Sequence, residues 1–225
     1  MKSLNARATL ALAGLAAGMA LLVFVPAGTV RYWQAWVYLV VLNGGSALIT
    51  IDLARRDPAL LERRMRGGPT AETRLPQKLI MLGTSLGFVA LLIVPALDHK
   101  RRWSTVPTAA SLAADALVAI GFFFIYLVYR ENTFTSATVQ VVAGQKVIST
   151  GPYAVIRHPM YASGALYLAA TPLALGSWWG LVPFAVIAPF LIWRLIDEER
   201  MLSETLPGYQ EYRRKVRYRL IPGVW

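Results

Sequence analysis

The chain of 225 residues contains no cysteine, which excludes disulfide bridges, thiolate metal ligands and a cysteine nucleophile. Charged residues are also scarce, at 16% of the chain against about 25% in soluble domains. Acidic residues are the rarer of the two signs, with 12 against 23 lysines and arginines. Little charge combined with 56% hydrophobic residues is typical of an integral membrane protein.

The apolar residues gather in windows that are nearly free of charge: 8–25, 33–51, 79–97, 109–129, 160–176 and 178–193. About 20 apolar residues in a helix cross a bilayer, so the first four windows are long enough. The last two are shorter and are separated only by Gly176 and Ser177, which predicts a tight helical hairpin. The expected fold is an all-α integral membrane protein with about five to six transmembrane helices.

The basic residues are distributed unevenly over the segments between these windows. If the amino terminus is cytoplasmic and every window crosses the membrane, most of the 23 basic residues face the cytoplasm. The opposite side keeps Arg31, Lys100, Arg101 and Arg102. This asymmetry follows the positive-inside rule and predicts that both termini are cytoplasmic. Topology and anionic lipid headgroups explain the excess charge, so we expect no nucleic-acid partner.

Two segments between the windows are long enough to need an interpretation. The basic segment Arg55–Lys78, interrupted by Gly67-Gly68-Pro69, is interpreted as a solvated loop that touches lipid headgroups, with a substrate gate as the alternative. Residues 132–150 are polar and β-branched without helical periodicity, which predicts an extended cytoplasmic connector. We therefore expect a four-helix membrane scaffold over 1–130 and a catalytic region over 131–225. The catalytic region would end in an interfacial helix rich in aromatic and basic residues.

Polar residues capable of chemistry lie at the edges of the last apolar windows. The run Arg157-His158-Pro159-Met160-Tyr161 follows a Gly-Pro turn. Proline favours the first helical position, so Pro159 predicts a helix start with His158 just outside it. Such a start offers free backbone N–H groups, and Arg157 adds positive charge, which together form an anion-binding corner. The alternative is that Arg157 and His158 are interfacial side chains that reach the headgroups.

A second polar run follows the hairpin. Arg194 and Glu198 lie four residues apart and share one helix face, where the simplest interpretation is an exposed intrahelical ion pair. Asp197, Glu198 and Glu199 cannot all point the same way, so at least one should face the inner surface of the hairpin. Because the two arms meet at a turn, both polar runs should converge into one pocket. Its groups suit a zwitterionic, amino-acid-like ligand with an aromatic base.

The combined pattern resembles a known family. Gly-Pro-Tyr, Arg-His-Pro-Met-Tyr, a hydrophobic hairpin, Arg-x-x-x-Glu-Glu and Tyr-x-x-Tyr are similar, over about residues 130–222, to the isoprenylcysteine carboxyl methyltransferase family. That family belongs to a wider group that includes phospholipid N-methyltransferases. The resemblance implies S-adenosylmethionine as methyl donor and a lipid-like acceptor that enters from the bilayer. It implies no metal.

The resemblance also implies roles for individual residues. The cofactor-binding residues would be Tyr153, His158, Tyr161, Glu198 and Glu199. Arg194 would orient the acceptor, and Arg157 would serve beside it in catalysis. The chain departs from the family in an amino-terminal part that is shorter than in eukaryotic members, and in Leu206-Pro207-Gly208-Tyr209, where many relatives have a Phe-Gly element before the tyrosine. Both departures concern the acceptor more than the cofactor.

Three functions are compatible with these residues. Carboxyl O-methylation of an isoprenoid-bearing or other lipid-like acceptor is favoured, because a carboxylate needs an orienting cation and no general base, and arginine stands beside the site. N-methylation of a phospholipid or small amine is the alternative and would need a nearby base. A transporter or a lipid-binding protein without catalysis is disfavoured, because transporters place polar groups near the membrane midplane, whereas here they lie at the helix ends.

Overall fold

The structure is a computed structural model that describes residues 2–67, 72, 74–142 and 144–225. Long helices are α1 (Lys2–Ala27), α2 (Trp33–Arg56), α4 (Leu75–Arg101), α5 (Thr108–Glu131), α6 (Pro159–Ala174) and α7 (Leu181–Thr205). Short ones are α3 (Pro58–Met65), α8 (Tyr209–Lys215) and the 3-10 turn η1 (Gly151–Ala154). The described residues contain no strand, so the predicted all-α fold is confirmed. Gly68 and Pro69 of the predicted loop break lie outside the described residues.

Among the described helices, α1, α2, α4 and α5 are long and apolar enough to cross a membrane, which confirms an integral membrane protein. The predicted hairpin is formed by α6 and α7. With 16 residues, α6 is about 24 Å long and shorter than the roughly 30 Å hydrocarbon core. The connection between the arms contains Gly176 at φ +72°, a left-handed conformation that favours glycine.

The helices begin and end where local chemistry dictates. Pro159 opens α6, with His158 as the preceding cap residue, as the sequence predicts. Gly208, at φ +83°, separates α7 from α8 at the predicted break. The segment Arg55–Lys78 is not a loop throughout, because α3 forms inside it. The Asp57 side chain accepts a hydrogen bond from the Leu60 N–H at 2.9 Å, and Pro58 occupies the first turn, so this helix start is strongly capped.

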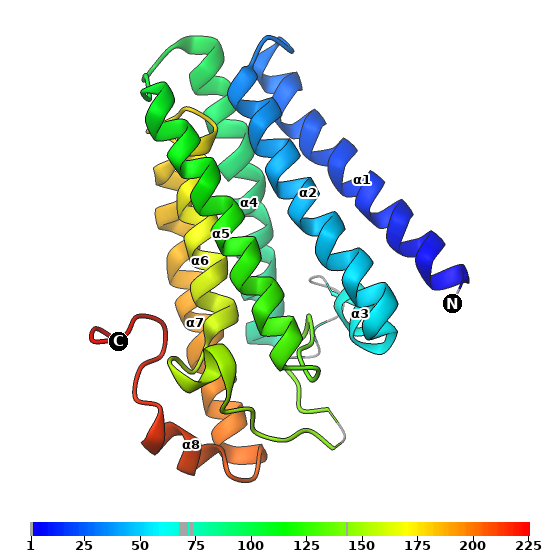
Figure 1. Ribbon diagram of the computed structural model, residues 1–225. Helices are drawn as coiled ribbons and strands as arrows, with labels where there is room; N and C mark the ends of the chain where they lie inside the picture. The colour runs from blue at the N-terminus through cyan, green and yellow to red at the C-terminus, as the bar shows by residue number, and fades with distance from the viewer. Residues whose placement is uncertain (1, 68–71, 73, 143) are drawn as a thin grey trace.

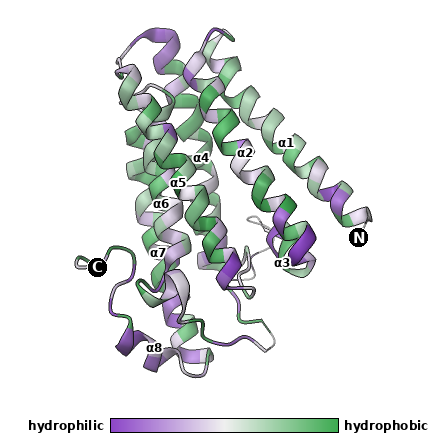
Figure 2. Cartoon of the chain, in the orientation of Figure 1, coloured by the Kyte–Doolittle hydropathy of each residue, from purple (hydrophilic) through white to green (hydrophobic). Residues whose placement is uncertain are grey.

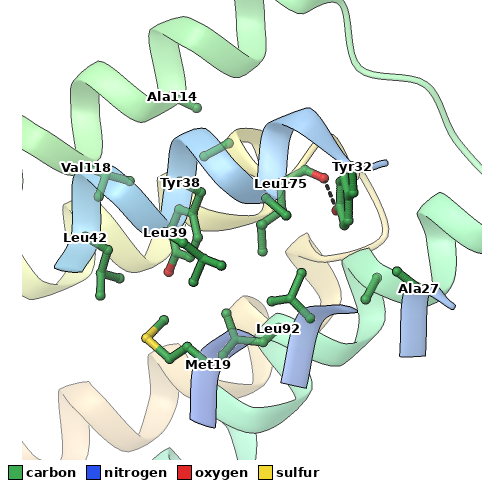
Figure 3. Close-up of a cluster of buried hydrophobic side chains, with 14 of the residues drawn as sticks. Met19, Ala27, Tyr32, Tyr38, Leu39, Leu42, Leu92, Ala114, Val118 and Leu175 are labelled. Carbon is green, nitrogen blue, oxygen red and sulfur yellow. Dashed lines mark hydrogen bonds between the residues drawn. The ribbon is translucent and has the colours of Figure 1, made fainter. Parts of the chain in front are cut away.

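Apolar side chains from α1, α2, α4, α5 and α6 pack into one core, which Figure 3 shows in close-up. Two buried tyrosines, Tyr32 directly before α2 and Tyr38 within α2, attach the hairpin to this core. The Tyr32 hydroxyl donates to the Leu175 carbonyl oxygen, and the Tyr38 hydroxyl lies 3.2 Å from the Thr171 hydroxyl. Buried hydroxyl groups need such partners, so these contacts fix the position of the hairpin relative to α2.

The helices form one elongated bundle in which α6 and α7 lie beside α4 and α5, while α1 and α2 complete the opposite side (Figure 1). One end of the bundle carries the amino terminus, α3, the segment 132–150 and α8. We call it the connector end, and we call residues 132–150 the connector. Hydrophobic residues predominate along the bundle, whereas hydrophilic residues gather around α3 and α8 at the connector end (Figure 2).

The packing of α4 against α7 can be tested at Gly87, where the two helices approach closely. A Cβ at Gly87 would lie less than 3.0 Å from Cγ1 of Ile187, a β-branched side chain that is 1% exposed. We therefore expect Gly87→Ala to cost about 1–3 kcal/mol through overpacking and to lower the melting temperature in detergent. Gly18→Ala on α1 is the matched control, because a Cβ there meets no atom within 4 Å. Equal melting of the two variants would contradict a tight α4–α7 contact.

Candidate functional site

A cavity of about 680 Å³ lies at the connector end, between α4, α5, α6 and α7 and against the connector. Ligand pockets in proteins usually measure about 300–1,000 Å³. One part of its wall is polar and includes Asn132, Tyr153, His158, Tyr161, Glu198 and Tyr209. Another part is mainly apolar and includes Phe88, Ile125, Leu168, Ile187 and Leu191. A single cavity therefore joins a polar end to an apolar arm inside the bundle.

Three arginines hold the connector in place over the cavity. Arg63 donates to the Thr133 carbonyl oxygen, and Nη1 of Arg64 donates to the Ser136 carbonyl oxygen at 2.7 Å. From the opposite side, Nη2 of Arg194 donates to the carbonyl oxygen of Ala137 at 3.0 Å. The described residues of the connector lie in no strand or helix that would satisfy these carbonyls, so guanidinium groups serve that purpose.

A buried ion pair joins the start of α6 to the end of α7. Nε of Arg157 lies 2.7 Å from Oε1 of Glu199, and the two side chains are 6% and 5% exposed. The second carboxylate oxygen of Glu199 accepts from Nε of Arg219 at 2.7 Å. Nη1 of Arg157 also donates to the carbonyl oxygens of Val216 and Arg217, at 2.8 and 2.7 Å. Arg157 thus binds the segment that follows α8 to the hairpin.

The environment of Glu199 decides its charge. Burial by itself would raise the pKa of this carboxyl group, but His158, Arg219 and the positive charge of Arg157 together lower the pKa to about 2. Glu199 is therefore ionised at neutral pH and balances charge rather than accepting a proton. The backbone N–H groups of Arg157 and His158 donate to the carbonyl oxygens of Tyr218 and Arg219, so the predicted anion corner is partly filled by the chain itself.

Glu198 faces a different environment from its neighbour. Its side chain lines the cavity, whereas Glu199 is not part of the cavity wall. The Tyr161 hydroxyl donates to Oε2 of Glu198. No cationic nitrogen among the described residues lies within ion-pair distance of Glu198. The structure thus brings both predicted polar runs together and gives the two glutamates separate positions.

Two buried polar atoms of the cavity wall have no hydrogen-bond partner among the described residues, namely Nε2 of His158 and the hydroxyl of Tyr209. The nearest carboxylate oxygen to that nitrogen, on Glu199, lies 3.9 Å away. Burial raises the pKa of Tyr209, and the charges of Glu199 and Glu198 raise it further, so its hydroxyl keeps its proton. Unsatisfied buried polar atoms are costly, so these two indicate a place for the polar atoms of a ligand.

Tyr153 and Tyr212 complete the polar end. Nδ2 of Asn132 donates to the Tyr153 hydroxyl at 3.0 Å, and the Tyr212 hydroxyl donates to the Tyr153 carbonyl oxygen at 2.8 Å. Asn132 is absent from the residues predicted by sequence. Its one local signal is its position directly after α5, at the start of the connector.

Arg194 does not form the simple intrahelical pair with Glu198. Its Nη2 lies 2.9 Å from Oε1 of Glu72, and its Nη1 donates to Oε1 of Gln77 at 2.8 Å. The same glutamine donates through Nε2 to Asp197 at 2.5 Å. The charge of Arg194 is thus balanced by a residue 122 positions away, next to α4. No local motif marks Glu72 or Gln77, so sequence reasoning missed both.

The fold and the cavity define an α-helical membrane protein with a ligand-sized site at one end. Residues 109–207, from α5 to just beyond α7, match the family model described as phospholipid methyltransferase. The match covers less than half of the chain, and the family of this model includes membrane methyltransferases of the isoprenylcysteine carboxyl methyltransferase type, so it agrees with the predicted resemblance. This match supports a membrane methyltransferase that acts on a lipid-like substrate. No curated protein matches the chain.

Because the pKa of Glu199 is lowered in the folded protein, the stability of the protein should depend on pH through this group. Its pKa of about 2 in the fold lies below the ordinary 4.5, so the ionised group stabilises the protein above about pH 4.5 and loses this effect as the pH falls toward 2. Glu199→Gln should destabilise the protein at neutral pH by about 3–5 kcal/mol, because Arg157 stays buried without its counterion. It should also remove this part of the pH dependence of the melting temperature.

The matched control is Glu204→Gln, an exposed glutamate near the end of the same helix. This variant should melt like the parent protein at every pH between 7 and 2. If Glu199→Gln and Glu204→Gln give the same pH profile, Glu199 does not carry the stabilising charge.

Proposed function

We propose that the protein is an integral membrane methyltransferase that uses S-adenosylmethionine and methylates the carboxylate of an isoprenoid-bearing or other lipid-like acceptor. One observation carries the proposal: a single cavity joins a polar end to an apolar arm. The polar end contains Glu198 and two buried atoms, of His158 and Tyr209, that have no hydrogen-bond partner among the described residues. The polar end suits the cofactor. The apolar arm suits a hydrocarbon chain, because burying apolar surface is the main driving force for holding such a chain.

The residues of the polar end fit S-adenosylmethionine. Glu198, a carboxylate without a cationic partner among the described residues, suits the ammonium group or the ribose hydroxyls of the cofactor. Nε2 of His158 and the hydroxyl of Tyr209 need polar partners, and the ring of Tyr153 offers an apolar face. When bound, the cofactor supplies an electrophilic methyl group on a positively charged sulfur.

Glu199 and Arg157 act in this proposal without touching the cofactor. Their ion pair fixes the end of α7 and the segment after α8, and so positions the neighbouring residues Glu198 and His158. Both are therefore positioning residues. Arg194, held in the cavity wall by Glu72 and Gln77, orients the acceptor carboxylate, which is ionised at neutral pH and needs no general base.

A second candidate function is N-methylation of a phospholipid amine. It is supported by the negative charge of Glu198 in the cavity wall. Arg194 is paired with Glu72, and no cationic side chain among the described residues lies within ion-pair distance of Glu198. A carboxylate in this state suits an amine acceptor and its proton. The description of the matching family, phospholipid methyltransferase, points the same way.

The proposal places the connector end in the cytoplasm, since most basic residues gather there. The catalytic groups then come from residues 131–225. Residues 1–130 form the membrane scaffold and supply apolar cavity residues such as Phe88 and Ile125.

Glu198→Ala tests the cofactor site. A hydrogen bond to a charged group contributes about 1.5–3 kcal/mol, so the variant should bind S-adenosylmethionine roughly 10- to 100-fold more weakly in a calorimetric titration. Glu204→Ala, at an exposed position of the same helix, should bind like the parent protein. Unchanged affinity in Glu198→Ala would remove this residue from the proposed site.

Transfer of a labelled methyl group tests the reaction and the role of Arg194. The full chain is incubated with labelled S-adenosylmethionine and a membrane lipid extract, and the product is treated with base. Volatile label indicates a methyl ester, whereas base-stable label indicates an N-methyl product. Arg194→Ala should lose at least about 99% of transfer, as expected for a removed orienting group, and should still bind the cofactor.

Arg200→Ala is the control for the Arg194 variant, because Arg200 is exposed on the same helix. It should transfer methyl groups at the parent rate. Full activity of Arg194→Ala would refute the orienting role, and absence of any labelled lipid with the parent protein would refute the proposed reaction.

A further inference from the structure

The cationic side chains in the cavity wall differ in how their charge is balanced. Among the described residues, the basic side chains that line the cavity are Arg64, Lys146, Arg157 and Arg194. Glu199 balances Arg157 at 2.7 Å, and Glu72 balances Arg194 at 2.9 Å. Lys146 is exposed to solvent on the connector. Arg64 is half-buried, and no carboxylate among the described residues lies within ion-pair distance of it.

The groups that Arg64 does contact are neutral. Nη1 donates to the Ser136 carbonyl oxygen at 2.7 Å, and the guanidinium carbon lies 5.4 Å from the centre of the Tyr129 ring. A carbonyl and an aromatic face hold a guanidinium in a defined orientation, but they leave its net charge uncompensated. The cavity wall therefore contains one fixed, half-buried cation that lacks a counterion from the described residues.

The helix that carries Arg64 is firmly positioned. Leu60 and Leu61 of α3 are 0% and 4% exposed and pack with Tyr129 and Met160 in a buried cluster. The capped start at Asp57 fixes the first turn of the helix. Figure 1 shows α3 at the connector end, directly after α2. In a membrane-spanning bundle this is the level of the lipid headgroups, where an anionic group of a lipid would lie.

We propose that Arg64 binds the anionic group of the methyl acceptor, and this inference rests on the proposed function. The ligand is an amphiphile with an oxyanion at headgroup depth and a hydrocarbon chain for the apolar arm. Two sources share this chemistry: the phosphate of an aminophospholipid, next to the amine that is methylated, and the carboxylate of a prenylated cysteine. Guanidinium groups pair with both oxyanions through two parallel hydrogen bonds. Arg64 is thus a specificity-determining residue of the site.

The neighbouring residue Arg63 supplies a matched control. Arg63 also donates to a connector carbonyl oxygen, that of Thr133, but it is not part of the cavity wall. Arg63→Gln and Arg64→Gln each remove a guanidinium contact to the connector. Only Arg64→Gln removes a charge from the cavity wall, so a difference between the two variants isolates the binding role.

The first measurement is equilibrium binding, which requires no turnover. The full chain in detergent is titrated with fluorescent phosphatidylethanolamine and, separately, with fluorescent S-farnesylcysteine that has a free carboxylate. Arg64→Gln should weaken the binding of at least one probe by about tenfold or more, whereas Arg63→Gln should change neither. Equal affinities in the two variants for both probes would overturn the proposal and reduce Arg64 to a contact of the connector.

The second measurement identifies the source of the oxyanion. If it is the phosphate, Arg64→Gln raises KM for phosphatidylethanolamine and leaves kcat nearly unchanged, because the phosphate takes no part in bond formation. A long-chain amine without phosphate then shows no difference between variants. If the carboxylate is bound, it is also the nucleophile, so Arg64→Gln raises KM and lowers kcat. Binding that depends on Arg64 without any methyl transfer would count against the proposed function alone.

Discussion

The structure of the connector end depends on one buried carboxylate, that of Glu199, and on the arginines that pair with it. Glu199 is 4% exposed, and a buried charge is stable only with counterions and hydrogen bonds around it. Arg157 and Arg219 supply them, and each brings a different part of the chain to the end of α7. Arg157 then binds the carbonyl oxygens of Val216 and Arg217. The start of α6, the end of α7 and the segment after α8 become one unit through this group.

The candidate site is built from the chain neighbours of this unit. His158 follows Arg157, and Glu198 precedes Glu199. Arg157 and Glu199 form the ion pair, whereas His158 and Glu198 line the cavity, whose wall also includes Arg157. The His158 side chain still lies close to the ion pair, at 3.9 Å from Glu199. A short polar motif thereby provides both the support and the ligand-facing surface. Arg194 uses a second network, with Glu72 and Gln77, to connect α7 with the start of α4.

Features governed by local chemistry could be predicted from the sequence. Pro159 marks the start of α6, and Gly208 marks the break before α8, because proline and glycine restrict or release the backbone at those positions. The convergence of the two polar runs follows from the hairpin turn near Gly176. The start of α3 was also encoded, in Asp57 and Pro58, but the basic composition of the segment suggested a loop.

Features that depend on packing could not be predicted. Whether Glu198 or Glu199 faces the cavity is decided by the rotation of α7 against its neighbours, since the two residues differ by only one position. The partner of Arg194 lies 122 positions away, so spacing alone favoured the nearer Glu198. Arg64 has no motif at all, and only the placement of α3 against Tyr129 and Met160 brings it to the cavity wall.

The contacts of Arg157 with the segment after α8 determine when, during biosynthesis, the cavity can reach its final structure. Ribosomes deliver the chain from its amino terminus, and membrane helices can insert as they emerge. The carbonyl oxygens of residues 216–219 accept hydrogen bonds from the side chain of Arg157 and from the backbone N–H groups of residues 157 and 158. These four residues are synthesised after every described helix of the bundle. The cavity therefore acquires its final form only late in translation, and a chain that stops before these residues would insert in the membrane with an incomplete site.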